Sequence, residues 1–139
     1  MKLTVNSLCP CGSLIKYKKC CKIFHDNIKN PSNALELMKS RFSAYAFKKS
    51  DYIIKTTHKD NIDYSINTEI WKKEIELFSS DTIFDKLEIL DFIDADIESF
   101  VTFKATLYQN KKDVSFIEKS RFIKENGLWL YVDGEFLDN

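Results

Sequence analysis

All four cysteines of this 139-residue chain lie between positions 9 and 21, and this clustering limits the fold of the segment more than any other feature. They form a Cys-Pro-Cys pair and a Cys-Cys pair, separated by eight residues. Structural disulfides usually close loops spread along a chain. Clustered thiols in a reducing compartment are instead typical of a metal site.

Zinc is the metal that this pattern favours. It binds four thiolates in a tetrahedron, at about 2.3 Å from each sulfur. Two close pairs supply such a set when the chain between them folds back, and Gly12 permits the tight turn that this requires. A site with four thiolates has no open position for water, so a structural zinc is expected. The predicted ligands are Cys9, Cys11, Cys20 and Cys21.

Three alternatives stay open at this point. Cys20 and Cys21 are adjacent and are able to form a redox pair, although Cys9 and Cys11 would then have no role. An iron–sulfur cluster also takes four thiolates. His25 follows the last cysteine by four residues and is able to replace one thiolate in the ligand set.

Charge and hydropathy exclude several classes of protein. The formal net charge is zero, whereas binding of nucleic acid over a whole surface usually needs a basic excess. The apolar run at the start is too short for a signal peptide, and no segment approaches the roughly 20 apolar residues of a membrane span. A cytoplasmic protein is therefore expected. Several lysines do precede the first acidic residue, Asp26, and they suit an acidic partner surface: Lys2, Lys16, Lys18, Lys19 and Lys22.

The remaining chain reads as helices followed by strands. Apolar residues recur at helical spacing over 34–48, 50–56 and 67–78. The period then changes to two, which predicts strands over 84–93, 99–108, 114–124 and 128–133. A four-residue turn is expected at 110–113, and Asn126-Gly127 signals a two-residue hairpin. We therefore expect an α+β protein with a zinc knuckle over 1–26, and helices packed on a curved antiparallel sheet over 27–139.

The expected register assigns side chains to the two faces of the sheet. It places Phe122 opposite Tyr131 and Ala105 opposite Glu118. Because side chains alternate along a strand, one face is apolar and suited to covering by helices; it carries Val101, Phe103, Ala105, Leu107, Phe116, Phe122, Trp129 and Tyr131.

Glu118 is the polar residue that does not suit this apolar face. A carboxylate there would be desolvated unless it is paired. Arg41 and His58 are the predicted partners from the helical half, in a buried ion pair that holds helix to sheet. The alternative is an acid that faces a pocket.

The string CPCGS, followed by YKKCC, resembles the SEC-C motif, a zinc knuckle found at the end of the SecA translocation ATPase and in many small bacterial proteins. The resemblance covers residues 8–22 and places all four cysteines on the motif's ligand positions. The motif commonly has a glycine after its serine, where this chain has Leu14. In SecA the similar motif docks onto a chaperone and onto ribosomal surfaces. The resemblance therefore implies a docking module for a protein or ribosomal partner.

The body of the chain resembles the YchJ-like family, a functionally uncharacterised bacterial family with a nuclear transport factor 2-like domain. The strings LMKSRFSAYAFKKSDYIIKTTH and IEKSRFIKENGLWLYVDG carry this resemblance. It implies a half-open cone with a pocket between helices and sheet. The candidate pocket residues are Arg41, Tyr45, His58, Glu118 and Trp129.

Members of this family often carry a second knuckle after the Asp-Gly turn, whereas this sequence reaches Asn139 without one. A function that needs two knuckles is therefore not expected here.

Two functions compete. The preferred prediction is a zinc-binding docking module carried on the cone-shaped domain. The alternative is a small-molecule binder or an acid–base enzyme, which would need His58, Glu118 or a tyrosine hydroxyl to meet in one cavity. No phosphate loop, nucleophile elbow or histidine–glutamate metal motif is present. Whether the chain is an enzyme stays open, and a homodimer through the sheet is a further expectation.

Overall fold

The structure, a computed structural model, describes residues 2–138 and has the α+β architecture that the sequence predicts. Its helices come first: η1 Tyr17–Lys19, α1 Lys22–His25, α2 Ala34–Ala46, α3 Ser50–Lys55 and α4 Thr68–Asp81. Its strands follow: β1 Ile83–Ile93, β2 Glu98–Gln109, β3 Lys112–Asp113, β4 Phe116–Glu125 and β5 Leu128–Leu137. Within these residues, no helix combines the length and the apolar character needed to span a bilayer.

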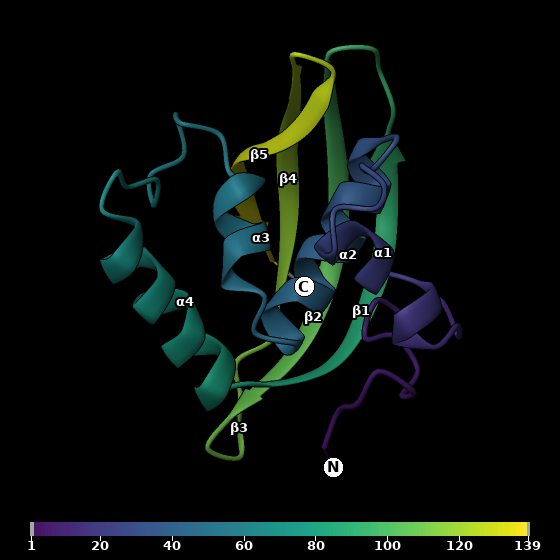
Figure 1. Ribbon diagram of the computed structural model, residues 1–139, viewed down its shortest axis with the longest axis vertical. Helices are drawn as coiled ribbons and strands as arrows, with labels where there is room; N and C mark the ends of the chain where they lie inside the picture. The colour runs from purple at the N-terminus through teal and green to yellow at the C-terminus, as the bar shows by residue number, and fades with distance from the viewer. Residues whose placement is uncertain (1, 139) are drawn as a thin grey trace.

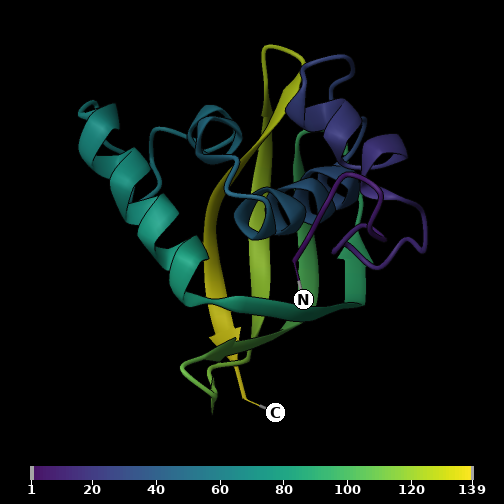
Figure 2. The same ribbon diagram turned by 60° about the horizontal axis from the view of Figure 1, so that its bottom comes forward.

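The two longer helices begin at asparagine caps. The side chain of Asn33 accepts a hydrogen bond from the backbone N–H of Glu36, and that of Asn67 accepts one from Ile70. Each bond satisfies a backbone donor that the first turn of a helix leaves free. In both views α4 lies to one side of the sheet and the cysteine-rich segment to the other, with α2 and α3 between them (Figures 1 and 2).

The strands form one curved antiparallel sheet in the order β1-β2-β4-β5, with β3 paired to β2. The register of β1 against β2 shifts at two places, between Phe84 and Lys86 and between Ile89 and Asp91. Such bulges bend a strand and increase its twist. The bent β1 and the curvature of the whole sheet are visible from below (Figure 2).

The turn between β2 and β3 differs from the expected one and shifts the register of β2 against β4. Asn110 and Lys111 both have positive φ, at 51° and 64°, and form a two-residue turn instead of the expected four-residue one. Phe103 therefore faces Glu118, in place of Ala105. The error is two residues, so each side chain stays on the predicted face.

The second hairpin has the predicted register near its turn, with Phe122 opposite Tyr131. A bulge at Arg121 and Phe122 follows, and β5 continues through Leu137, beyond the expected end of the strand.

Helices and sheet enclose the main core between them. The predicted apolar face of the sheet is confirmed, because its members are buried or half-buried and share one hydrophobic core with apolar residues of α2 and α4. A second, smaller core lies in the knuckle and consists of Cys9, Cys11, Tyr17 and Cys21, with Cys20 and Phe47 packed against them.

Candidate functional site

The four cysteines meet in one cluster at the end of a small folded ribbon. The ribbon is held by backbone hydrogen bonds from Cys9 to Ile15 (2.8 Å) and from Tyr17 to Ser7 (2.9 Å). Gly12 has a φ of +87°, which lets the chain turn between these two segments. All four Sγ atoms lie within 4.8 Å of one another.

This geometry fits a tetrahedral metal site. A zinc ion bound at about 2.3 Å by four sulfurs separates those sulfurs by about 3.8 Å. The Sγ atoms of Cys11 and Cys20 are 3.7 Å apart. All four cysteines are free thiols in the structure, so no disulfide joins Cys20 and Cys21 there. The cluster is therefore compatible with one bound metal ion.

Hydrogen bonds among the thiols shift the pKa values of Cys9 and Cys21 in opposite directions. A bond from Cys11 is the main reason that the pKa of Cys9 is lowered, while the pKa of Cys21 is raised, chiefly by its bond with Cys11. Four neighbouring thiolates repel one another. A cation is what allows all four to lose their protons together, as metal ligation requires.

His25 is engaged outside the cluster. Its Nε2 donates to the backbone carbonyl of Ser40 (2.8 Å), and its Nδ1 accepts from the Tyr17 hydroxyl (2.6 Å). Burial lowers its pKa, which favours the neutral ring that these two bonds require. Both ring nitrogens are occupied, so the alternative in which His25 replaces a thiolate is wrong.

Two serine hydroxyls support the sulfurs. Ser43, on α2, lies 3.3 Å from the Sγ of Cys9, and Ser13 lies 3.1 Å from the Sγ of Cys20. Hydroxyl donors of this kind orient thiolate ligands and disperse their charge. Ser43 was not predicted from the sequence, because no local pattern connects a helix residue with a cysteine 34 positions earlier.

The knuckle is fixed to the body by aromatic contacts. The Tyr17 ring is 1% exposed and stacks on Phe47, just after α2, with 3.6 Å between the ring centroids. The His25 ring also contacts Tyr52 of α3 at a centroid distance of 4.8 Å. On the other side, a Cβ added to Gly12 would lie 3.6 Å from the carbonyl oxygen of Leu87 in β1. The knuckle thus sits in a fixed place beside β1 and α2 (Figure 1).

The outer edge of the knuckle is apolar and exposed. Leu14 is 79% exposed, Leu8 58% and Ile15 49%, and we call these three residues the rim. Leu14 also has a φ of +66°, the left-handed conformation that glycine adopts without cost. Exposed lysines flank the rim, namely Lys16, Lys18 and Lys19.

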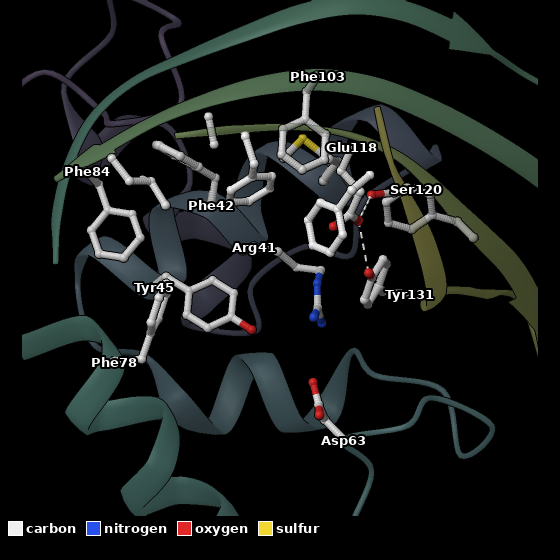
Figure 3. A pocket seen from close by; sticks show the side chains of 16 residues that line it. Arg41, Phe42, Tyr45, Asp63, Phe78, Phe84, Phe103, Glu118, Ser120 and Tyr131 are labelled. Carbon is white, nitrogen blue, oxygen red and sulfur yellow. Dashed lines mark hydrogen bonds between the residues drawn. The ribbon is translucent and has the colours of Figure 1, made fainter. Parts of the chain in front are cut away.

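A cavity of about 350 Å³ lies between the helices and the concave face of the sheet (Figure 3). Most of its wall is aromatic or aliphatic, from α2, α4 and all four long strands. The polar residues in the wall are Arg41, Tyr45, Asp63, Glu118, Ser120 and Tyr131.

Arg41 enters the cavity from α2. Its Nη1 donates to the carbonyl of Ile53 (3.1 Å) and to the hydroxyls of Thr56 (2.7 Å) and Thr57 (3.1 Å), all at the end of α3. The guanidinium carbon lies 4.8 Å from the centroid of the Tyr131 ring. These contacts fix the direction of the guanidinium group.

The predicted ion pair of Glu118 is wrong. Its Oε2 accepts hydrogen bonds from Ser120 and from the Tyr131 hydroxyl (2.9 Å), as Figure 3 shows. Burial and the neighbouring Glu118 raise the pKa of Tyr131, which keeps its hydroxyl protonated as the donor. The partners come from the sheet itself, whereas the predicted partner was a charged residue from the helical half. A buried carboxylate is satisfied by neutral donors as well as by a cation.

The five predicted pocket residues divide into two groups. Arg41, Tyr45 and Glu118 line the cavity. His58 and Trp129 are not part of its wall: His58 Nε2 donates to Glu125 at 2.6 Å, and the indole of Trp129 is buried in the main core. Asp63, Ser120 and Tyr131 also line the cavity and were not predicted as pocket residues, although Tyr131 was predicted on the correct face of the sheet.

The chain matches two family models. One is described as "YchJ, middle NTF2-like domain" and covers residues 33–134; the other is the SEC-C motif and covers residues 6–22. The UPF0225 protein VP1145 of Vibrio parahaemolyticus is 38% identical over 132 residues, which are 94% of this chain and 75% of that protein.

Two solved structures share the fold. The SEC-C motif containing protein RPA3114 of Rhodopseudomonas palustris is 27% identical with a TM-score of 0.79, over 96% of this chain and 99% of that one. A SEC-C motif containing protein of Psychrobacter arcticus is 23% identical with a TM-score of 0.77, over 99% of this chain and 87% of that one. The similarity to the Psychrobacter arcticus protein shows a shared fold only.

Proposed function

This chain belongs to the YchJ-like family of SEC-C proteins, and we propose that it is a cytoplasmic zinc protein whose knuckle docks onto an acidic protein surface, on the ribosome or free. In this proposal residues 1–26 are the docking module and residues 27–139 are the cone-shaped domain that carries it. Pairing of two copies through the sheet stays a prediction.

The identity of the metal rests on the donor set. Cys9, Cys11, Cys20 and Cys21 offer four soft sulfur ligands within 4.8 Å of one another, and zinc prefers such a set in a closed tetrahedral site. A closed site holds the fold and leaves no position for a substrate. The contribution of the metal is therefore to fold the ribbon and to hold the rim in place.

The docking role rests on the exposed rim. A knuckle that served only its own fold would have no need of three exposed aliphatic side chains beside a group of lysines. Leu14 is the clearest case, because it is both highly exposed and held in a left-handed conformation that is unfavourable for leucine. An apolar tip flanked by positive charge is complementary to an apolar groove on an acidic surface.

Ser43→Ala is expected to weaken zinc retention by about 10-fold, because the Cys9 thiolate loses its buried hydroxyl donor. Competition with a chromogenic chelator measures this change. Ser79→Ala is the matched control, since Ser79 is also a buried helix serine but its hydroxyl has no hydrogen-bond partner among residues 2–138. Equal zinc affinity in both variants would remove Ser43 from the metal site.

Leu14→Gly is expected to change stability and docking in opposite directions. Glycine relieves the left-handed strain, which raises the free energy of unfolding by up to about 1 kcal/mol after the entropy of glycine is subtracted. Partner binding falls because the rim loses its most exposed side chain. Lys111→Gly is the control, because Lys111 has the same conformation at φ 64° in a turn remote from the knuckle. It should gain stability and keep partner binding.

A photo-crosslinking amino acid at position 14 tests the partner directly in cells. The control carries the same group at Ile62, which is 96% exposed in the α3–α4 loop. The proposal expects an acidic protein that crosslinks at position 14 and not at position 62, and that is lost when Lys16 and Lys18 become glutamate. Cosedimentation with purified ribosomes then separates a ribosomal partner from a free one. The same crosslinked proteins at both positions would contradict a docking role.

A further inference from the structure

The cone cavity contains two charged groups that the protein leaves incompletely paired. Arg41 and Glu118 are each only 8% exposed. No carboxylate oxygen of residues 2–138 lies within 4.0 Å of the Arg41 guanidinium group, and no basic nitrogen lies within that distance of Glu118. Neutral partners hold one side of each group, at Nη1 of Arg41 and Oε2 of Glu118. Because a buried charge without a counter-charge is still unfavourable, a ligand explains these positions better than the stability of the fold alone.

The free atoms of Arg41 point into the cavity. The Thr56 and Thr57 hydroxyls and the Ile53 carbonyl all bind Nη1. Nε and Nη2, the pair of donors that fits a carboxylate, take part in none of these three bonds, and the guanidinium group has one further hydrogen-bond contact among residues 2–138, with the Tyr45 hydroxyl. In Figure 3 the guanidinium group extends from α2 into the open centre of the cavity.

Glu118 offers one free acceptor in the same space. Ser120 and Tyr131 both bind Oε2, which leaves Oε1 without a partner in residues 2–138. The Tyr131 ring lies between the two charged groups: its face meets Arg41 and its hydroxyl meets Glu118. Backbone bonds of Tyr131 to Thr56 and His58 hold this ring in place. Cation and acceptor are therefore kept apart at a fixed separation, with an apolar wall around them.

We propose that the cavity binds a small carboxylic acid with an aromatic or branched aliphatic body and a hydroxyl or amino donor at its far end. The carboxylate lies against Nε and Nη2 of Arg41, the body packs among the aromatic walls, and the donor bonds to Oε1 of Glu118. The cavity volume is at the small end of the range for ligand pockets. This site goes beyond the docking role and does not depend on it.

Asp63 provides a second test, in which a substitution should raise the affinity for the acid instead of lowering it. It is exposed at the mouth of the cavity, and its carboxylate points toward Arg41 (Figure 3). A ligand carboxylate at Arg41 is repelled by this neighbour. Removing the charge of Asp63 therefore strengthens the binding of an acid and leaves the binding of a neutral analogue unchanged.

Three probes of similar shape are titrated into the zinc-loaded full chain. Isotope-edited NMR detects their binding. They are 4-hydroxyphenylacetate, the alcohol 2-(4-hydroxyphenyl)ethanol, which lacks the carboxylate, and 4-methoxyphenylacetate, which lacks the phenolic donor. We expect saturable binding of the first, with affinity about 10- to 100-fold above the alcohol and several-fold above the methoxy compound.

Variants assign the binding to the named groups. Arg41→Lys keeps the charge but loses the paired donors of the guanidinium group, and it should lower the affinity for the acid by about 10-fold. Glu118→Gln should abolish the preference for the phenol over the methoxy compound. Asp63→Asn should raise the affinity for the acid by a few-fold. Lys104→Ala, on the opposite face of the sheet, is the control that should change nothing. Equal affinity for acid and alcohol, absence of saturable binding up to about 10 mM, or the same loss in Lys104→Ala would each overturn the proposal.

Discussion

Replacing Cys21 by serine is expected to abolish zinc binding and to lower the free energy of unfolding of the whole chain by more than about 3 kcal/mol. Cys21 is buried in the small core and joins the ribbon to α1. Without the metal this core has little to hold it together, because with the residues packed against it the core contains four thiols and only two aromatic rings. Elemental analysis gives the zinc content, and chemical denaturation gives the free energy.

The wild-type protein supplies the control for this variant. Chelation should lower its stability by a similar amount, and added zinc should restore it, whereas added zinc should not restore Cys21→Ser. A purified, reduced wild-type protein with no zinc would contradict the metal assignment. Iron in place of zinc would revive the iron–sulfur alternative.

Gly134→Ala is expected to destabilise the chain by about 3 kcal/mol, although glycine has no special backbone conformation there. A Cβ at this position would lie 2.8 Å from the Cγ of Glu118 and closer still to its Cδ. Glu118 is unable to swing aside freely, because Ser120 and Tyr131 hold its carboxylate. The substitution therefore either strains the sheet or displaces a buried acid from its donors.

A double-mutant cycle with Glu118→Ala isolates this contact. In that background Gly134→Ala should cost less than about 1 kcal/mol, because the atoms that it meets are gone. Gly127→Ala is the matched glycine control: its φ is +78°, and apart from its chain neighbours no atom of residues 2–138 lies within 4 Å of the added carbon. It should show a backbone cost that is the same in both backgrounds. Additive effects of Gly134→Ala and Glu118→Ala in denaturation would refute the contact.

Local patterns in the sequence were enough to predict the order of elements and the apolar face of the sheet. Both depend on periodicity, which holds wherever one side of an element is buried. The hairpin at 126–127 was also recognisable, because Asn-Gly is favoured where both turn residues have positive φ. The turn at Asn110 and Lys111 has the same conformation, but lysine is not a residue that signals it. That is why the register there was predicted two residues away from its observed value.

The candidate sites divide in the same way. The four cysteines are close in sequence and carry a recognisable spacing, so their meeting could be predicted. The support from Ser43 and the donors of Glu118 come from residues that tertiary packing brings together. The partly unpaired state of Arg41 and Glu118 is also a property of the packed cavity. No residue pattern distinguishes a buried pair from two groups held apart by the ring of Tyr131.

Helix α2 contributes to both sites at once. The backbone carbonyl of Ser40 and the hydroxyl of Ser43 contact the knuckle, whereas Arg41 and Tyr45 line the cavity. The knuckle is therefore not an independently transferable unit. Its deletion would uncover the rings of Phe47 and Tyr52, and its transfer to another protein would leave Tyr17 without its stacking partner. An engineered fragment that is to keep the packing of this knuckle therefore has to include α2.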